Sequence, residues 1–376
     1  KDPASGLSTE ADVAIADHRV VAIETGLSSM ATTTIDCQGR FVTPGLIDSH
    51  THIFEAVSKV GARADEAHLR RGVVAAVDAG TAGASTFPAF LRLVVEPSRL
   101  KVLSYLNVSV LGLIDFRFGE LINPAALVKE DDVAVARAYP DVVKGMKIRL
   151  SSDVVGEDEA MCLTLLERAL EASGEARLPL MVHIGETPAS LDEILARLGR
   201  GDVVAHCYTG KEEGILGEDG KVRECVSDAR ERGVVFECAH GKSNFSYAVA
   251  GPAIEQGFLP DIVCSDTSGR NWNGPVFDLM TTMAKLVSLG MTLDEVLERV
   301  TIAPAERLGL TGDGYGRLEV GGRAHITVFG AHDPTEELPD AAGGSRRVRR
   351  LEPELVVLDG EVIESLPWRG VVPAVA

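Results

Sequence analysis

Short apolar runs recur through the middle of the chain at intervals that suit alternating strands and helices. Each run is mostly apolar along its whole length, which is typical of parallel strands buried on both faces. Amphipathic stretches with helical spacing lie between many of them, at 159–172, 191–198, 222–232 and 244–256. The runs are Leu46–His52, Val73–Ala79, Val102–Leu111, Val143–Leu150, Leu180–Ile184, Val203–Cys207, Val234–Cys238 and Ile262–Cys264.

Eight such strand–helix units predict the α/β class and a (β/α)8, TIM-like barrel. The stretch from Asp48 to Leu310 has a length close to the ~250 residues typical of this fold. We therefore expect residues 48–310 to form the barrel domain.

The two ends of the chain carry a different pattern, of short strands separated by turns. Asp359-Gly360 is a strong hairpin signal between the last two of these strands. Residues 333–350 are rich in Asp, Glu, Gly and Arg and predict a solvated loop. We expect residues 1–47 and 311–376 to meet in one small, discontinuous β-sandwich domain. The predicted strands are Asp12–Ile15, Val20–Ile23, Thr34–Cys37, His325–Phe329, Leu355–Leu358 and Glu361–Ile363.

Composition narrows the classes of partner. The chain of 376 residues is 45% hydrophobic and 25% charged, as in ordinary globular proteins. A net charge of −19 argues against nucleic acid and anionic membranes as partners, because both need a basic surface. No apolar stretch approaches the ~18 residues of a membrane span, and no signal-peptide pattern opens the chain. The six cysteines show no CxxC spacing, which predicts a reducing, cytoplasmic setting.

The first apolar run of the barrel ends in His50-Thr51-His52, after a Pro44-Gly45 turn. Side chains two positions apart in a strand point to the same face. Two imidazoles on one face at the end of a buried strand can hold one metal ion from the same side, although a pair of loop histidines has the same pattern.

Reactive groups of a barrel of this kind lie at the C-terminal ends of its strands. The following strand ends carry Lys144 and Lys147, then His183, His206, His240 and Asp266 in chain order. A lone histidine closing an apolar strand is usually a hydrogen-bonded core residue. Such residues at successive strand ends point instead to a metal site of imidazole nitrogen and carboxylate oxygen, the donors that zinc and similar ions favour.

The order His-x-His, Lys, His, His, Asp resembles the binuclear-metal branch of the amidohydrolase superfamily along the whole chain. The resemblance implies that His50, His52 and Asp266 hold a buried metal ion and that His183 and His206 hold a more exposed one. It also implies that Lys147, carboxylated by carbon dioxide, bridges both ions as a carbamate. Lys147 is favoured over Lys144 because it lies nearer the strand end and on the opposite face.

Two divalent ions, zinc by preference, would make a bridging hydroxide that attacks a carbonyl carbon. Asp266 would accept the proton of this hydroxide and return it to the leaving group. Tyr208 and His240 are the candidates for a donor that steadies the developing oxyanion.

The substrate is less sharply indicated. Dihydroorotases of the superfamily place an Arg two positions after the second His, where this chain has Phe54, and single-metal deaminases lack the bridging lysine. The segments 147–151, 240–245 and 265–275 are similar to a branch often labelled dihydroorotase or deacetylase-like, which includes esterases for acetylated α-hydroxy acids. We therefore expect hydrolysis of a small acyl ester or amide that carries a carboxylate. The candidate substrate-binding residues are Arg149, Arg270 and Asn271.

Two alternatives remain open at this point. One is a cyclic amidase of hydantoinase or dihydroorotase type, and the other is a catalytically inactive binding subunit that has kept its ligands. A homo-oligomer would suit the resemblance, but no surface pattern in the sequence identifies an interface.

Overall fold

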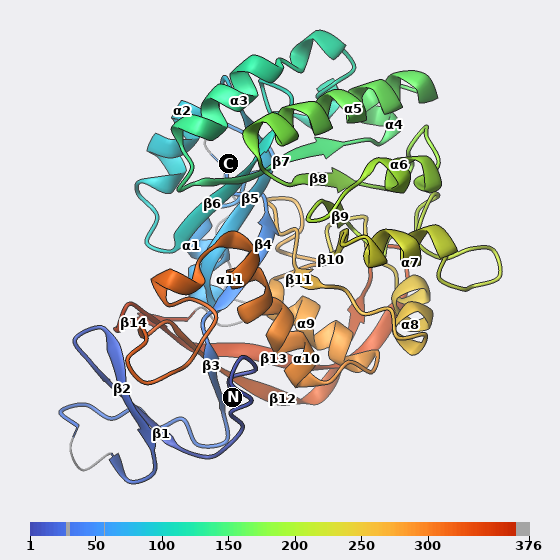
Figure 1. Ribbon diagram of the computed structural model, residues 1–376. Helices are drawn as coiled ribbons and strands as arrows, with labels where there is room; N and C mark the ends of the chain where they lie inside the picture. The colour runs from blue at the N-terminus through green and yellow to red at the C-terminus, as the bar shows by residue number, and fades with distance from the viewer. Residues whose placement is uncertain (28–30, 56, 366–376) are drawn as a thin grey trace.

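Eight parallel strands form one curved sheet at the centre of the molecule (Figure 1). The computed structural model describes residues 1–27, 31–55 and 57–365. The strands follow one another in sheet order as they do in the chain, so each predicted apolar run became a neighbour of the next. Their bounds are β4 Leu46–Thr51, β5 Val73–Gly83, β6 Lys101–Asn107, β7 Val143–Arg149, β8 Leu180–His183, β9 Val203–Ala205, β10 Val235–Ala239 and β11 Ile262–Cys264.

The sheet closes where β11 meets β4. A parallel bridge joins Thr51 to Thr267, and the Asp266 amide donates to the His50 carbonyl at 2.8 Å. The buried Asp48 carboxylate accepts from the Ser265 amide at 3.0 Å and from the Ser265 hydroxyl at 2.5 Å. The barrel fold expected from the sequence is confirmed, and its seam brings the first and last strand ends together.

Helices surround the barrel and cover its apolar outer face (Figure 1). Asp158, Ser190, Asp278 and Thr292 each cap a helix with a side-chain oxygen, which satisfies amides that a helix leaves free at its start. The α-helices are α1 Ala64–Ala67, α2 Phe87–Phe90, α3 Lys129–Ala138, α4 Ser152–Val155, α5 Glu159–Ala176, α6 Leu191–Arg197, α7 Glu224–Glu231, α8 Tyr247–Glu255, α9 Leu279–Ser288, α10 Leu293–Val300 and α11 Ile302–Leu308. Short 3-10 turns are η2 Leu69–Arg71, η4 Phe116–Phe118, η5 Pro124–Ala126 and η6 Thr311–Asp313, and η3 Leu91–Val95 is a π-helical turn.

Both chain ends contribute to antiparallel sheets outside the barrel, as the sequence predicts. One sheet has the order β14-β13-β12-β3, so the N-terminal β3 pairs with strands from the C-terminal part. A second sheet contains β1 and β2. The boundaries at 47/48 and 310/311 stay a prediction, and residues 366–376 lie outside the described residues. The bounds are β1 Asp12–Ala16, β2 Arg19–Glu24, β3 Phe41–Pro44, β12 Ile326–Pro339, β13 Ser345–Leu358 and β14 Glu361–Glu364.

Two predictions for the chain ends were wrong. Residues 34–37 form no strand: three of them are exposed, and the segment belongs to none of the sheets in the described part of the chain. Residues 333–350 are no loop, because most of them belong to the long β12–β13 hairpin. Buried Leu338 and Val348 anchor this hairpin, and ion pairs such as Arg350 with Glu336 cross it. Charged pairs across the two strands thus stabilise a hairpin that lacks the alternating apolar residues on which the strand prediction relied.

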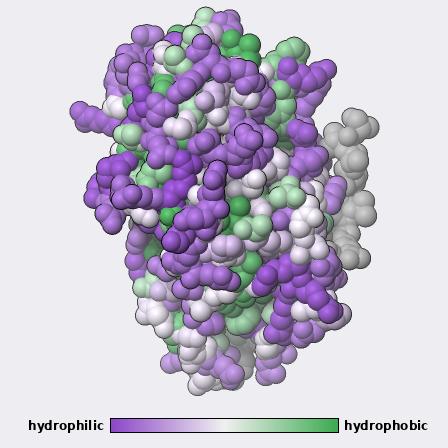
Figure 2. All heavy atoms as spheres, turned by 90° about the vertical axis from the view of Figure 1, so that its right-hand side faces the viewer, coloured by the Kyte–Doolittle hydropathy of each residue, from purple (hydrophilic) through white to green (hydrophobic). Residues whose placement is uncertain are grey.

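The surface carries the charge of the chain. The face that includes α7 and α8 is mostly hydrophilic, with smaller hydrophobic areas scattered over it (Figure 2). Among the described residues, the helices are all too short or too polar to cross a bilayer.

Candidate metal centre

His50 and His52 lie at the end of β4 and face the barrel interior. Both Nε2 atoms point toward Asp266, which follows β11: its Oδ1 lies 3.8 Å from His50 Nε2 and 3.2 Å from His52 Nε2. All three side chains are nearly buried. The seam between β4 and β11 therefore assembles a carboxylate and two imidazoles.

His206 follows β9 and brings a third imidazole to the same place. Its ring centroid lies 5.2 Å from that of His50 and 4.3 Å from that of His183, at the end of β8. One ligand atom each from His50, His206 and Asp266 lies within 4.8 Å of the others, a spacing compatible with metal binding. The structure thus gathers the predicted histidines from β4, β8 and β9 with Asp266.

Backbone strain is concentrated at two of these residues. His206 has φ of 68° and Asp266 has φ of 53°, a left-handed region that residues with a side chain rarely adopt. Such conformations cost about 1–3 kcal/mol each and persist where the surroundings enforce them. Here they turn both side chains inward just beyond the strand ends.

Three imidazoles have their Nδ1 atoms within hydrogen-bond distance of protein oxygens. His50 Nδ1 lies 2.5 Å from Glu237 Oε1, His52 Nδ1 lies 2.8 Å from Thr81 Oγ1, and His206 Nδ1 lies 2.9 Å from the Ala239 carbonyl. Metal-binding histidines usually donate their second nitrogen in this way, which fixes the tautomer and leaves Nε2 free to coordinate.

Lys147 on β7 completes the interior of the cluster. Its side chain is 1% exposed, and its Nζ has no hydrogen-bond partner among the described residues. Burial lowers the pKa of the Lys147 amine to about 8, so a neutral amine is accessible near neutral pH. Gly80 on β5, with φ of +86°, leaves room for this side chain, since a Cβ there would lie 2.7 Å from Lys147 Cγ. Lys144 points outward instead and donates to the Pro140 carbonyl.

The surroundings of these side chains favour the protonation states that bind a cation, which are neutral imidazole and ionised carboxylate. Burial lowers the pKa of His206 to about 3 and the pKa values of His50 and His183 well below the usual range. Burial raises the pKa of Asp266, but hydrogen bonding from His52 and the nearby rings outweigh it and hold this pKa below the usual range. Neutral imidazoles around a carboxylate, with a buried amine lacking a partner, fit divalent metal ions.

The loop after β11 holds Asp266 in place. Asn271 is buried and donates through Nδ2 to the Asp266 carbonyl at 2.7 Å, while its Oδ1 accepts from the Ser268 amide. Gly241 lies against the Asp266 carboxylate, where a Cβ would overlap Oδ2. Asn271, expected to bind substrate, is thus committed to shaping this loop.

The two candidate arginines contact the same aromatic ring but differ in whether a carboxylate pairs with them. Arg149 at the end of β7 lies 5.0 Å from the Phe116 ring and is paired with the Glu120 carboxylate at 3.0 and 3.1 Å. Arg270 lies 4.8 Å from the same ring, is exposed, and has no ion pair among the described residues. Only Arg270 therefore presents an uncompensated guanidinium.

Tyr208 and His240 do not join the cluster. The Tyr208 hydroxyl is buried and donates to the Phe258 carbonyl at 2.8 Å. His240 stacks on Phe245, and its Nε2 accepts from Lys285 at 2.8 Å. Both side chains have hydrogen-bond partners within the protein, and their oxyanion role stays a prediction.

Sequence reasoning missed the residues that hold the histidines from behind. Glu237 on β10 is 2% exposed, and burial raises its pKa to about 7. Thr81 on β5 supports His52. A signal existed for Glu237, since it interrupts the apolar run Val234–Cys238 with a carboxylate. The Thr81 contact left no comparable signal.

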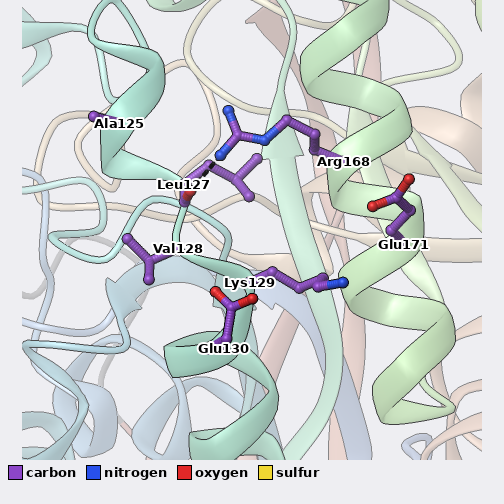
Figure 3. A pocket seen from close by; sticks show the side chains of 7 residues that line it. All are labelled: Ala125, Leu127, Val128, Lys129, Glu130, Arg168 and Glu171. Atoms are coloured by element: carbon purple, nitrogen blue, oxygen red, sulfur yellow. Dashed lines mark hydrogen bonds between the residues drawn. The ribbon is translucent and has the colours of Figure 1, made fainter.

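A pocket of about 300 Å³ opens elsewhere on the surface, between α5 and the start of α3 (Figure 3). Arg168 reaches across it to the Leu127 carbonyl. None of its lining residues belongs to the histidine cluster, so we do not assign the chemistry to it. The lining residues are Ala125, Leu127, Val128, Lys129, Glu130, Arg168 and Glu171.

The sequence profile of the Amidohydrolase family matches residues 41–363. A deacetylase of Agrobacterium fabrum is 36% identical, over 92% of this chain and 85% of its own length. A deacetylase of Enterococcus faecalis is 35% identical, over 94% of this chain and 95% of its own length.

Two solved structures with different functional names resemble this chain to a similar degree. A crystal structure of an adenine deaminase superposes with a TM-score of 0.86 and 34% identity, covering 94% of this chain and 96% of that one. A crystal structure of a dihydroorotase superposes with a TM-score of 0.88 and 33% identity, covering 96% of each chain. The relatives thus carry names for different reactions, and the site residues must discriminate between them.

Proposed function

Because the chain belongs to the amidohydrolase family and is a hydrolytic enzyme, we propose that its histidine cluster holds two divalent metal ions, zinc by preference. His50, His52 and Asp266 would hold one ion and His183 and His206 the other. The observation that carries the proposal is the shared geometry of His50, His52 and His206. Their Nδ1 atoms are tied to the protein, which leaves Nε2 for a metal.

Lys147 supports a second ion. An amine buried without a partner is costly unless it is neutral or modified. We propose that the neutral Lys147 amine forms an N–C bond with carbon dioxide and releases a proton, which gives a carbamate, an anion that can bridge two cations. This lysine also argues against the single-metal deaminase reading, despite the adenine deaminase name of one structural neighbour.

We propose that the substrate is a small acyl ester or amide that carries a carboxylate, such as an acetylated α-hydroxy acid. The metal ions, when bound, would lower the pKa of a water molecule and polarise the acyl carbonyl. Asp266 is a carboxylate at neutral pH and would accept the proton from that water at a carboxylate oxygen. Arg270, whose charge is uncompensated, would bind the substrate carboxylate through paired hydrogen bonds.

The relatives named deacetylase support acyl-bond hydrolysis. A cyclic amidase is the second candidate, favoured by the dihydroorotase structure with a TM-score of 0.88. A homo-oligomer stays a prediction. Arg149 is a weaker candidate for the substrate carboxylate, since Glu120 already compensates its charge.

Metal analysis and substrate turnover on the full chain test this proposal. We expect two equivalents of metal per chain, loss of activity with a chelator, and recovery with zinc. Acetylated hydroxy acids should turn over faster than hydantoins and dihydroorotate, and the reverse order would favour the cyclic amidase. Arg270→Met should raise KM for the carboxylate substrate by about 10–100-fold, the worth of a charge-assisted contact. Full activity without metal would refute the proposal.

A further inference from the structure

We propose that Glu237 is a positioning residue that strengthens one of the two metal sites by holding His50 through a carboxylate–imidazole hydrogen bond. This inference rests on the metal centre proposed above. It adds a residue that touches neither ion and predicts that the two sites differ in affinity. Glu237 comes from β10, a strand that contributes none of the proposed ligands.

The geometry places Glu237 and the metal on opposite nitrogens of one ring. His50 Nδ1 lies 2.5 Å from Glu237 Oε1, whereas His50 Nε2 faces Asp266 Oδ1 at 3.8 Å. Both side chains are nearly inaccessible, at 1% and 2% exposure. An ion at Nε2 and a carboxylate at Nδ1 would therefore polarise the same imidazole in the same direction.

The Glu237 carboxyl group faces an imidazole and has no cationic side chain in direct contact within the described part of the chain. Among residues 1–27, 31–55 and 57–365, Glu237 lies within ion-pair distance of His50 and of neither lysine nor arginine. A buried carboxylate is costly without compensation, and a neutral imidazole compensates it weakly. A metal ion on the far nitrogen of His50 would place positive charge on the opposite side of the ring from Glu237.

The three supported histidines differ in the acceptor behind them. His50 has a carboxylate, His52 has the Thr81 hydroxyl, and His206 has the Ala239 carbonyl. A carboxylate raises the basicity of an imidazole ligand more than a neutral oxygen does. The ion held by His50, His52 and Asp266 should consequently be the more tightly bound of the two.

A rival reading makes Glu237 itself a ligand. His50, Glu237 and Cys264 also offer ligand atoms within 4.8 Å of one another. In that arrangement a metal would take His50 Nδ1, the nitrogen that faces Glu237. The hydrogen-bond distance of 2.5 Å between these two atoms leaves no room for an ion of ~2.0 Å bond length between them.

Glu237→Gln tests the charge with little change of shape. Glu237 and Ser49 line a cavity of about 10 Å³ in the barrel floor, and a smaller residue at position 237 would enlarge it. We would titrate zinc into metal-free protein against a chromophoric chelator for wild type, Glu237→Gln, Thr81→Val and Cys264→Ala. Thr81→Val removes a neutral acceptor, and Cys264→Ala removes the rival ligand.

Glu237→Gln should weaken one zinc equivalent by about 10–100-fold and leave the second unchanged. Thr81→Val should weaken the same equivalent less, and Cys264→Ala should leave both unchanged. Equal affinities in wild type and Glu237→Gln would overturn the inference, as would loss of a zinc equivalent in Cys264→Ala. Wild-type protein that binds no zinc would instead refute the metal centre itself.

A structure of the zinc-loaded wild-type enzyme tests the inference even if the variants do not fold. Zinc on His50 Nε2, with Glu237 still hydrogen-bonded to Nδ1, is the expected result. Zinc bound to Glu237 or to His50 Nδ1 would overturn it.

Discussion

Two lysines of this protein are buried to the same extent but have opposite surroundings. Lys147 in the barrel and Lys285 on α9 are 1% and 0% exposed. Lys285 donates to His240 Nε2 at 2.8 Å and to the Pro275 and Pro339 carbonyls at 2.7 Å each. Lys147 Nζ has no partner among the described residues.

The difference separates a structural lysine from one for which we propose a chemical role. The Lys285 amine donates to three acceptors. It thereby connects α9 to the loop after β11 and to the end of β12 in the outer sheet. Burial lowers the pKa of both amines, to about 7 for Lys285 and about 8 for Lys147, so the shift alone does not distinguish them. The hydrogen-bond contacts distinguish them, because the Lys147 amine lies among imidazoles and a carboxylate without an acceptor of its own. Such an amine needs a bound group that the protein itself does not provide.

The largest expected effect is the loss of catalysis in Lys147→Met. Without the proposed bridging carbamate both proposed ions should be lost, and the rate should fall by about 10³-fold or more, since metal ions contribute several kcal/mol to such reactions. Metal content by elemental analysis and initial rates would measure it. The free energy of unfolding of the metal-free variant should not fall, because a buried amine without partners has been removed. A destabilised but active variant would assign Lys147 a structural role.

Lys285→Met should have the opposite outcome. Its substitution leaves the His240 ring and two carbonyls without their donor, at a cost of about 3 kcal/mol in the free energy of unfolding. Urea denaturation of the metal-free protein would measure this, with Lys147→Met as the matched control. Zinc binding should stay at two equivalents, and its loss would show that the link also shapes the metal centre.

A small carboxylate should partly replace the missing bridge. Lys147→Ala leaves space for acetate, whose oxygens can contact both ions. Added acetate should raise the rate of this variant by about 10–100-fold, the worth of a charge-assisted contact. Lys285→Ala serves as the control and should not respond. The same response in both variants would mean that acetate acts elsewhere.

The smallest effect concerns pH and stability. Because the pKa of Lys285 falls from 10.5 to about 7 on folding, the unfolded chain binds a proton between these values that the folded chain does not. Stability from this group therefore rises with pH above 7, by at most about 1.4 kcal/mol per pH unit. The difference in unfolding free energy between wild type and Lys285→Met, followed from pH 7 to 9, isolates it. A difference that shrinks with rising pH would contradict this assignment.

The sequence by itself determined the barrel and the order of the candidate ligands along it. Apolar runs buried on both faces predicted every strand from β4 to β11, and polar residues within or just after those runs identified the candidates His50, His52, His183, His206, Lys147 and Asp266. These are local properties: side-chain alternation and strand ends depend on neighbours a few residues away. The β12–β13 hairpin escaped the same reasoning because cross-strand ion pairs and a few buried residues support it.

Only the tertiary structure decided which of the candidates face one another. Glu237 supports His50 across 187 positions of sequence, Tyr208 and His240 turn to other partners, and Arg149 is compensated while Arg270 is not. Closing the barrel sets these contacts, since it fixes the direction of each strand end relative to strands far away in the chain. No local sequence pattern encodes the direction of a strand end. This direction determines whether a buried polar side chain joins two elements, positions a neighbouring side chain or can bind a metal ion.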